Sequence, residues 1–134
     1  MRQNSLWPAT RRRPEDRLET QISECGSFHV VTVRGRLTLD TSPALLDELR
    51  RVLRHPGDAH QLKVNLREVG FLDSSGISVL IQGLKLAQEK SVTFVLLDPS
   101  PKVRAVIELS QLQDFFNIEI PGEAAADGSP CGAA

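Results

Sequence analysis

The stretch FLDSSGISVLIQGLKLAQ, residues 71–88, decides the fold of this chain, because an apolar strand end meets a long amphipathic helix there. Four small or polar residues, Asp73, Ser74, Ser75 and Gly76, form the junction. The apolar residues that follow have helical spacing: Ile77, Leu80, Ile81, Leu84 and Ala87. One capping side chain is enough for a helix start, so capping alone does not explain this junction.

Strand-like and helix-like patterns alternate on both sides of this junction. Strand patterns cover residues 18–23, 28–35, 61–66 and 91–98. One helix pattern begins at Ser42-Pro43, another covers residues 99–112, and a last short element lies within 114–120. The glycine-containing link at 24–27 predicts a hairpin. This order predicts an α/β fold with a single mixed sheet, mostly parallel with an antiparallel edge hairpin, flanked by three to four helices.

Composition divides the chain into one domain and two terminal segments. Residues 1–17 hold five arginines against Glu15 and Asp16, which predicts a disordered basic arm. Residues 121–134 are small, rich in glycine and proline, and unpatterned, which predicts a disordered tail. The domain is therefore expected to span residues 18–120.

Charge and hydropathy narrow the function classes. The formal net charge of −1 gives no reason to expect direct binding of nucleic acid or of an anionic membrane. No apolar run approaches the roughly 20 residues that a membrane span needs, and the start lacks the apolar core of a signal peptide. We therefore expect a cytoplasmic protein. Cys25 and Cys131 form neither a disulfide framework nor a metal site; a regulatory bridge between them stays open.

The two serines do not match a hydrolase site. A nucleophile elbow needs G-x-S-x-G, but the residue two before Ser74 is Leu72. His29 lies within a predicted strand, while His55 and His60 flank a turn, so no histidine is an evident base. Phosphate-loop and metal-ligand patterns are absent from the sequence. We predict no catalytic residue, no metal, no cofactor and no enzymatic activity.

A regulatory modification explains the junction better. A phosphate on Ser74 would add about −1.5 to −2 charges, which a helix N-terminus tolerates. The fold should therefore survive the modification. The anion would lie next to Asp73 on a surface that could otherwise bind a partner, so we expect phosphorylation to weaken binding through desolvation and charge repulsion.

Residues 18–120 resemble the STAS domain of bacterial anti-sigma factor antagonists. The most specific features are the apolar strand, D-S-S-G, the amphipathic helix after it, and P-x-V-R-x-V-I-E-L-S-x-L at 101–112. The resemblance implies a sheet with helices on one side. It also implies that the unphosphorylated protein binds an anti-sigma factor, typically a serine kinase, and so frees a sigma factor for transcription. The kinase phosphorylates the first serine of D-S-S-G, and a metal-dependent serine phosphatase reverses this.

The resemblance assigns roles to the residues of the junction. Ser74 would be the phosphoacceptor and Asp73 its acidic neighbour. Ser75 and Gly76 would shape the partner-binding loop and the helix start.

One segment departs from the family pattern. The family often has G-E-L-D after its second strand, on a loop near the phosphorylated serine. Here the segment is GRLTLD, with Arg36 and Thr38 in place of the acidic residues and Asp40 two positions later. Arg36 could hold a phosphate by charge-assisted hydrogen bonds. These three residues are included in the predicted partner-binding loop.

A second function is compatible with the same fold. The chain could be a non-switching STAS interaction module in another assembly, such as the accessory subunit of a lipid-transport ATPase or a stress-complex scaffold. The intact D-S-S-G segment favours the phosphorylation switch. The departure of GRLT from the family pattern is compatible with a non-switching module.

Overall fold

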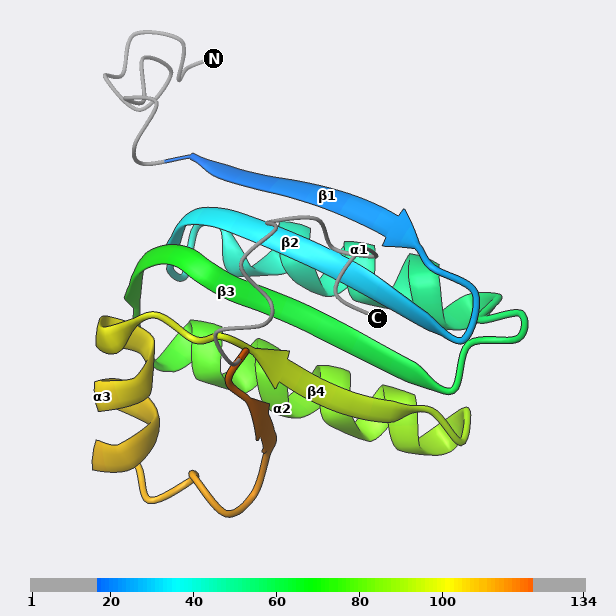
Figure 1. Cartoon of the computed structure of the whole chain (residues 1–134). Coiled ribbons are helices and arrows are strands. Elements are labelled where there is room, and N and C mark those ends of the chain that lie inside the picture. The colour runs from blue at the N-terminus through cyan, green and yellow to red at the C-terminus, as the bar shows by residue number, and fades with distance from the viewer. Residues whose placement is uncertain (1–16, 122–134) are drawn as a thin grey trace, which may run out of the picture.

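The computed structural model describes residues 17–121, which form one sheet and three helices (Figure 1). The strands are β1 (Leu18–Glu24), β2 (Phe28–Leu37), β3 (Gln61–Leu72), β4 (Thr93–Leu97) and β5 (Asn117–Glu119). The helices are α1 (Ser42–Arg54), α2 (Ser74–Glu89) and α3 (Pro101–Leu109).

The sheet has the predicted mixed character. Its strands lie in sequence order, with β1 antiparallel to β2 and every later pair parallel. Each parallel pair is joined through a helix, and such crossovers are right-handed, so consecutive helices fall on the same face. Accordingly, α1 and α2 lie side by side behind the sheet in Figure 1. The predicted fold class is confirmed.

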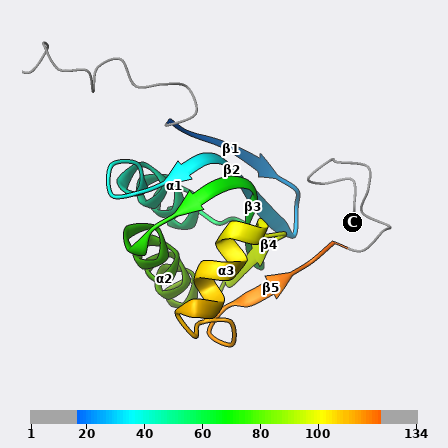
Figure 2. The same cartoon turned by 90° about the vertical axis from the view of Figure 1, so that its left-hand side faces the viewer.

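Helix α3 packs near the carboxyl end of β3 (Figure 2). Ser100 fixes its start: its side chain accepts a hydrogen bond from the Val103 N–H at 3.3 Å and donates one to the Val69 carbonyl at 2.6 Å. The backbone N–H of Ser100 donates to the Leu66 carbonyl at 3.2 Å. One capping residue thus joins the helix to the strand that leads into the D-S-S-G junction.

The main core lies between the sheet and the first two helices. Fully buried side chains from α1, α2 and the three central strands meet there. They include Val31, Val33, Leu45, Leu49, Leu62, Val64, Leu80, Phe94 and Leu96. This apolar contact stabilises the scaffold that holds the strand ends in place.

Strand β3 continues to Leu72, beyond the segment 61–66 predicted from alternation. Its register with β2 shifts twice, between Thr32 and Arg34 and between Gly35 and Arg36. Such bulges break the two-residue period, so the buried residues Leu66, Val69 and Leu72 are three apart.

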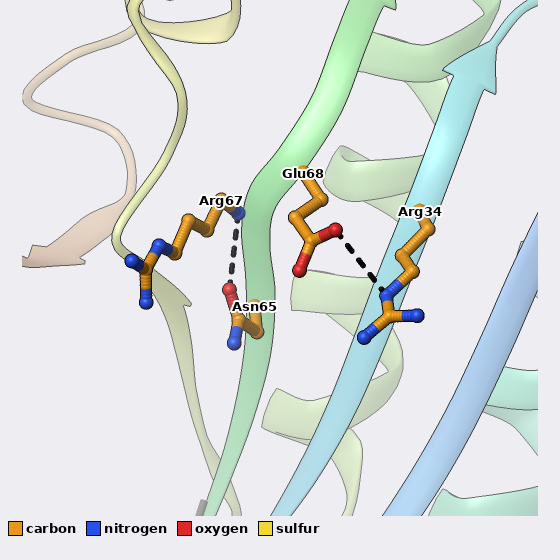
Figure 3. A network of polar contacts seen from close by, with 4 residues as sticks. All are labelled: Arg34, Asn65, Arg67 and Glu68. Carbon is orange, nitrogen blue, oxygen red and sulfur yellow. Dashed lines mark hydrogen bonds and ion pairs between the residues drawn. The ribbon is translucent and has the colours of Figure 1, made fainter. Parts of the chain in front are cut away.

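Polar contacts accompany the first bulge (Figure 3). The Arg67 N–H donates to Asn65 Oδ1 at 3.0 Å, and Arg34 Nε lies 3.4 Å from Glu68 Oε1. The side chain of Asn65 thus satisfies a backbone donor where the strand is irregular.

Helix α1 begins one residue earlier than the Ser42-Pro43 start signal implies, since that signal places Pro43 at the first helical position. The cap is Thr41, whereas Ser42 is already helical and buried, and Pro43 follows within the first turn. The Thr41 hydroxyl makes no capping bond to the helix but donates to the Arg36 carbonyl at 2.6 Å. Pro43 therefore marks the helix start within one residue, but as the second helical residue and not the first.

The predicted terminal arm and tail lie outside the described residues, apart from Arg17 and Pro121, and so does Cys131. Within the described part of the chain, no helix is long and apolar enough to cross a membrane. Between residues 17 and 121 there is also no cluster of side chains that could hold a metal ion.

Candidate functional site at the start of helix α2

Asp73 is the N-cap of α2. Its Oδ1 accepts hydrogen bonds from the N–H groups of Ser75 at 2.8 Å and Gly76 at 3.1 Å. These bonds satisfy two of the donors that every helix start leaves unpaired. The Asp73 carboxylate thus caps the helix, and neither Ser74 nor Ser75 is needed as a cap.

The same carboxylate joins two loops. Its Oδ2 accepts a hydrogen bond from the Leu39 N–H at 3.1 Å, and the Asp73 N–H donates to the Leu37 carbonyl at 3.2 Å. Leu39 lies on the β2–α1 connection, 34 residues earlier in the chain. Asp73 therefore holds the loop before α1 against the start of α2.

Ser74 is the exposed residue of the junction. Its hydroxyl forms no hydrogen bond with any residue between 17 and 121, and Ser75, which is half-buried, forms none through its side chain either. Because Asp73 caps the helix, the Ser74 hydroxyl is accessible on a rigid element. This arrangement suits a residue that another protein modifies.

Gly76 packs against the end of β2 and does not form part of the exposed surface. A Cβ at this position would overlap the Leu72 side chain and would come within 3.0 Å of the Leu37 carbonyl oxygen. Glycine thus permits the close approach of α2 to β2. Because Gly76 is buried, it shapes the helix start from within the fold, and its predicted part in the partner-binding loop stays a prediction.

Two threonines build the β2–α1 loop. The Thr41 hydroxyl accepts from the Thr38 N–H at 2.8 Å, and the Thr38 carbonyl accepts from the N–H groups of Thr41 and Ser42. The Thr38 hydroxyl accepts from the Asp40 N–H at 3.3 Å. Thr38 therefore has a local role in shaping the loop, whereas Asp40 is exposed on it.

Arg36 lies within β2 and not on the loop, which corrects its predicted place. Its guanidinium carbon is 4.3 Å from the centroid of the Phe71 ring, in a cation–π contact. Arg36 and Phe71 are paired across β2 and β3. They precede Leu37 and Leu72, which face the helices, so this pair lies on the opposite face of the sheet.

A shallow groove of about 420 Å³ lies between the first turns of α1 and α2. Its lining combines apolar and hydroxyl side chains with one amide: Leu39, Ser42, Pro43, Leu46, Ser74, Ser75, Ser78, Val79 and Gln82. Neither helix has an acidic residue in its first turn. The groove therefore offers apolar contacts beside two positive helix-dipole ends.

Sequence reasoning missed two residues of this site. Leu39 is 71 % exposed beside Ser74, and an apolar residue in the polar segment 38–41 was the available signal. Thr41 holds the loop through Thr38 and Arg36, but its role depends on the folded loop. The structure places the β2–α1 loop, which holds Thr38 and Asp40, next to the junction through the bond from the Leu39 N–H to Asp73; the part of these residues in partner binding stays a prediction.

Replacing Asp73 with alanine should destabilise the protein by about 1–2 kcal/mol, because two helix N–H groups and the Leu39 N–H lose their acceptor. Urea unfolding followed by circular dichroism measures the change. Ser74→Ala is the matched control and should stay within about 0.5 kcal/mol of wild type. Equal stability of Asp73→Ala and wild type would contradict the capping role.

Comparison with known proteins agrees with this architecture. A family model described as "Mlab, STAS domain" matches residues 21–119. The chain belongs to the STAS domain family. Among curated STAS relatives, the anti-sigma-B factor antagonist of Staphylococcus epidermidis is 28% identical over 91 residues, covering 68% of this chain and 82% of that protein. The antagonist of Staphylococcus aureus strain NCTC 8325 is 28% identical over 101 residues, covering 75% and 92%.

Solved STAS structures share the fold. An anti-sigma factor antagonist from Mycobacterium paratuberculosis superposes with a TM-score of 0.70 and 25% identity, covering 83% of this chain and 91% of that chain. The antagonist SpoIIAA in its unphosphorylated form gives a TM-score of 0.65 at 21% identity, covering 78% and 90%. Its phosphorylated form gives 0.60 at 20% identity, covering 78% and 93%. The STAS fold is thus found in both forms of SpoIIAA.

Proposed function

We propose that this STAS protein is an anti-sigma factor antagonist. It binds an anti-sigma factor of the serine kinase type, so that a sigma factor is released, and phosphorylation at Ser74 ends the binding. A serine phosphatase restores the active form. The protein acts as a regulator and has no catalytic role of its own.

The single observation that carries the proposal is that one residue of the junction caps the helix while its neighbour, Ser74, is left exposed. Asp73 makes all the capping bonds, while the Ser74 hydroxyl is exposed and forms no bond to the described residues. A phosphate there would lie beside the N-terminus of α2, which favours an anion. Modification is therefore compatible with the fold, as the two forms of SpoIIAA also illustrate.

The groove beside Ser74 supplies the docking surface in this proposal. Leu39 and Pro43 are exposed apolar residues on one side of it, and Val79 lies on the other. Partner binding would cover Leu39 and Pro43, since Val79 is already buried, and would bring the Ser74 hydroxyl into the contact. A phosphate would then have to be desolvated next to the Asp73 carboxylate, which is unfavourable for the complex.

The GRLT departure bears on the choice of partner. Thr38 shapes the loop through its hydroxyl and offers no charge, so Asp40 is the carboxylate of the loop that a partner cation could reach. Arg36 is engaged with Phe71 on the other face. We infer that the partner kinase contacts a loop with fewer acidic side chains than the same loop has in a typical family member.

A non-switching STAS module in another assembly is the second candidate. Arg36 and Thr38 stand where the switching antagonists often have acidic residues, and this departure favours the scaffold. A scaffold needs the docking face but no phosphorylatable serine. The two candidates predict different dependence on ATP and on Ser74.

Incubation with the cognate kinase tests the proposal. The kinase is captured with tagged wild-type protein from the source cells, then purified and mixed with the protein and ATP. Intact-mass and peptide mass spectrometry should find one phosphate, on Ser74, and none on Ser74→Ala. Phosphate on another residue, or partners that bind both phosphorylated and unphosphorylated protein, would favour the scaffold.

Replacing Leu39 with alanine should weaken kinase binding at least about tenfold, since exposed apolar anchors carry much of an interface's affinity. Stability should change by less than about 0.5 kcal/mol because the side chain is 71 % exposed. Titration calorimetry gives the affinity. Leu109→Ala is the matched control, because Leu109 is 84 % exposed on α3 and away from the groove. Equal effects of both variants would exclude the groove as the docking surface.

A further inference from the structure

Thr41 occupies the N-cap position of α1, but its hydroxyl does not cap the helix. A threonine at this position usually accepts a hydrogen bond from an N–H group of the first helical turn. Here the hydroxyl bonds to the preceding loop: it donates to the Arg36 carbonyl at 2.6 Å and accepts from the Thr38 N–H at 2.8 Å. The helix thus lacks a side-chain cap, and the loop gains two hydrogen bonds.

Leu39 lies inside the segment that these two bonds close. Its side chain is 71 % exposed beside the groove, so apolar packing does little to hold it in place. Its position therefore depends on the hydrogen bonds of the backbone around it. The Leu39 N–H donates to Asp73 Oδ2 at 3.1 Å, and the N–H of the residue before it, Thr38, donates to the Thr41 hydroxyl.

Thr41 is the most deeply buried polar residue of this loop. It is 5 % exposed, whereas Thr38 is half-buried and Asp40 is exposed. Water can readily replace a hydrogen bond that is lost at an exposed group, but a buried group reaches water only if the structure opens. Loss of the Thr41 hydroxyl would leave the Thr38 N–H and the Arg36 carbonyl without these partners. The loop should then open, and Leu39 should move with it.

We propose that Thr41 is a positioning residue for partner binding: its hydroxyl holds the β2–α1 loop closed and so keeps Leu39 beside the groove before the partner arrives. The inference rests on the proposed function, in which the partner kinase docks on the groove. An anchor that is already ordered loses less conformational entropy when it binds. Thr41 thus raises the affinity although it is itself buried beneath the loop.

Hydrogen exchange of the free protein, followed by NMR, tests the positioning step without the kinase. Thr41→Val keeps the shape of the side chain but lacks the hydroxyl. The Leu39 amide should exchange at least about tenfold faster in this variant than in wild type. Thr41→Ser, which keeps the hydroxyl, should stay within about threefold of wild type. If Thr41→Val does not fold, Thr41→Ala serves in its place, because its smaller side chain lets water reach the Thr38 N–H.

Thr32→Val is the matched control for Thr41→Val. Thr32 lies on β2, and its hydroxyl forms no hydrogen bond with any residue of the range 17–121. Thr32 does not line the groove between α1 and α2. The same chemical change at this position should leave the exchange of the Leu39 amide and the kinase affinity unchanged.

Kinase affinity, measured by titration calorimetry, tests whether Thr41 acts through Leu39. Thr41→Val should bind the kinase about fivefold or more weakly than wild type, and Thr41→Ser within about twofold of it. In Leu39→Ala protein the same Thr41→Val change should have less than about a twofold further effect. A general loss of structure would instead weaken binding equally in both backgrounds. Circular dichroism reports whether each variant is folded.

The results that would overturn the proposal are distinct from one another. Unchanged exchange of the Leu39 amide in Thr41→Val would mean that the hydroxyl does not hold the loop. Wild-type affinity of Thr41→Val, or an equal loss in the Leu39→Ala background, would mean that Thr41 does not act through Leu39, while the proposed function would stand. Wild-type affinity of Leu39→Ala would contradict the docking surface itself, and the proposal would fall with it.

Discussion

Ser74→Asp protein is expected to keep its fold and to bind the kinase at least about a hundredfold more weakly than wild type, a loss of about 2.7 kcal/mol. Aspartate carries one negative charge at the position where phosphate would carry about −1.5 to −2. Ser74 is exposed, so the charge is solvated in the free protein. In the complex it would lie beside Asp73 at a closed contact, and removal of its water is unfavourable.

Two control variants make this measurement specific. Ser74→Ala removes the hydroxyl without adding charge and should bind within a few-fold of wild type. Ser27→Asp adds the same charge to an exposed residue of the β1–β2 turn, at the other end of the sheet, and should also bind normally. Affinities come from titration calorimetry, and circular dichroism and thermal melting report the fold.

Two outcomes would count against the switch. Unfolding of Ser74→Asp would mean that the junction needs an uncharged residue for stability. Wild-type affinity of Ser74→Asp, together with an intact fold, would mean that the partner does not contact this edge and would favour the scaffold function.

Gly35→Ala should destabilise the protein by about 3 kcal/mol or more, a large part of the 5–15 kcal/mol typical of a domain. Gly35 has φ +115°, in a region that side chains strain to adopt. A Cβ there would also overlap the backbone carbonyl of Arg17, where β1 begins to pair with β2. Backbone atoms cannot move aside as a flexible side chain could, so the end of the hairpin should separate.

Gly26→Ala is the matched control for Gly35→Ala. Gly26 also has positive φ, at +84°, but a Cβ there would meet nothing within 4 Å. This variant should lose only about 1 kcal/mol, the effect of backbone strain without overlap. Thermal melting should show a fall of roughly 10 °C or more for Gly35→Ala and a much smaller one for Gly26→Ala. Equal falls would mean that the contact with Arg17 is unimportant.

The sequence predicts most of the scaffold because its elements obey regular periods. Leu45 and Leu49 follow a helical period, and Val31 and Val33 follow a strand period, so their elements and buried faces were predictable. The second half of β3 was not, because two bulges place Val69 and Leu72 three residues apart. Bulges arise from pairing with β2, which a single strand's pattern does not encode.

The candidate site was predicted only in part, because some of its contacts depend on strand pairing and not on local sequence. The D-S-S-G segment pointed to Asp73 and Ser74 through local rules of capping and charge. The bond from Asp73 to the Leu39 N–H joins residues that only the parallel pairing of β2 and β3 brings together. Leu39 and the true position of Arg36 therefore became evident only in the folded chain.

The bonds of Asp73 also bear on how fast this protein could convey a signal. The Asp73 carboxylate, and not the Ser74 hydroxyl, anchors both loops, so adding a phosphate to Ser74 removes none of these bonds. We therefore expect no backbone rearrangement to precede the change in binding. The response time would then be set by the enzymes that add and remove the phosphate, and the domain itself would introduce no delay.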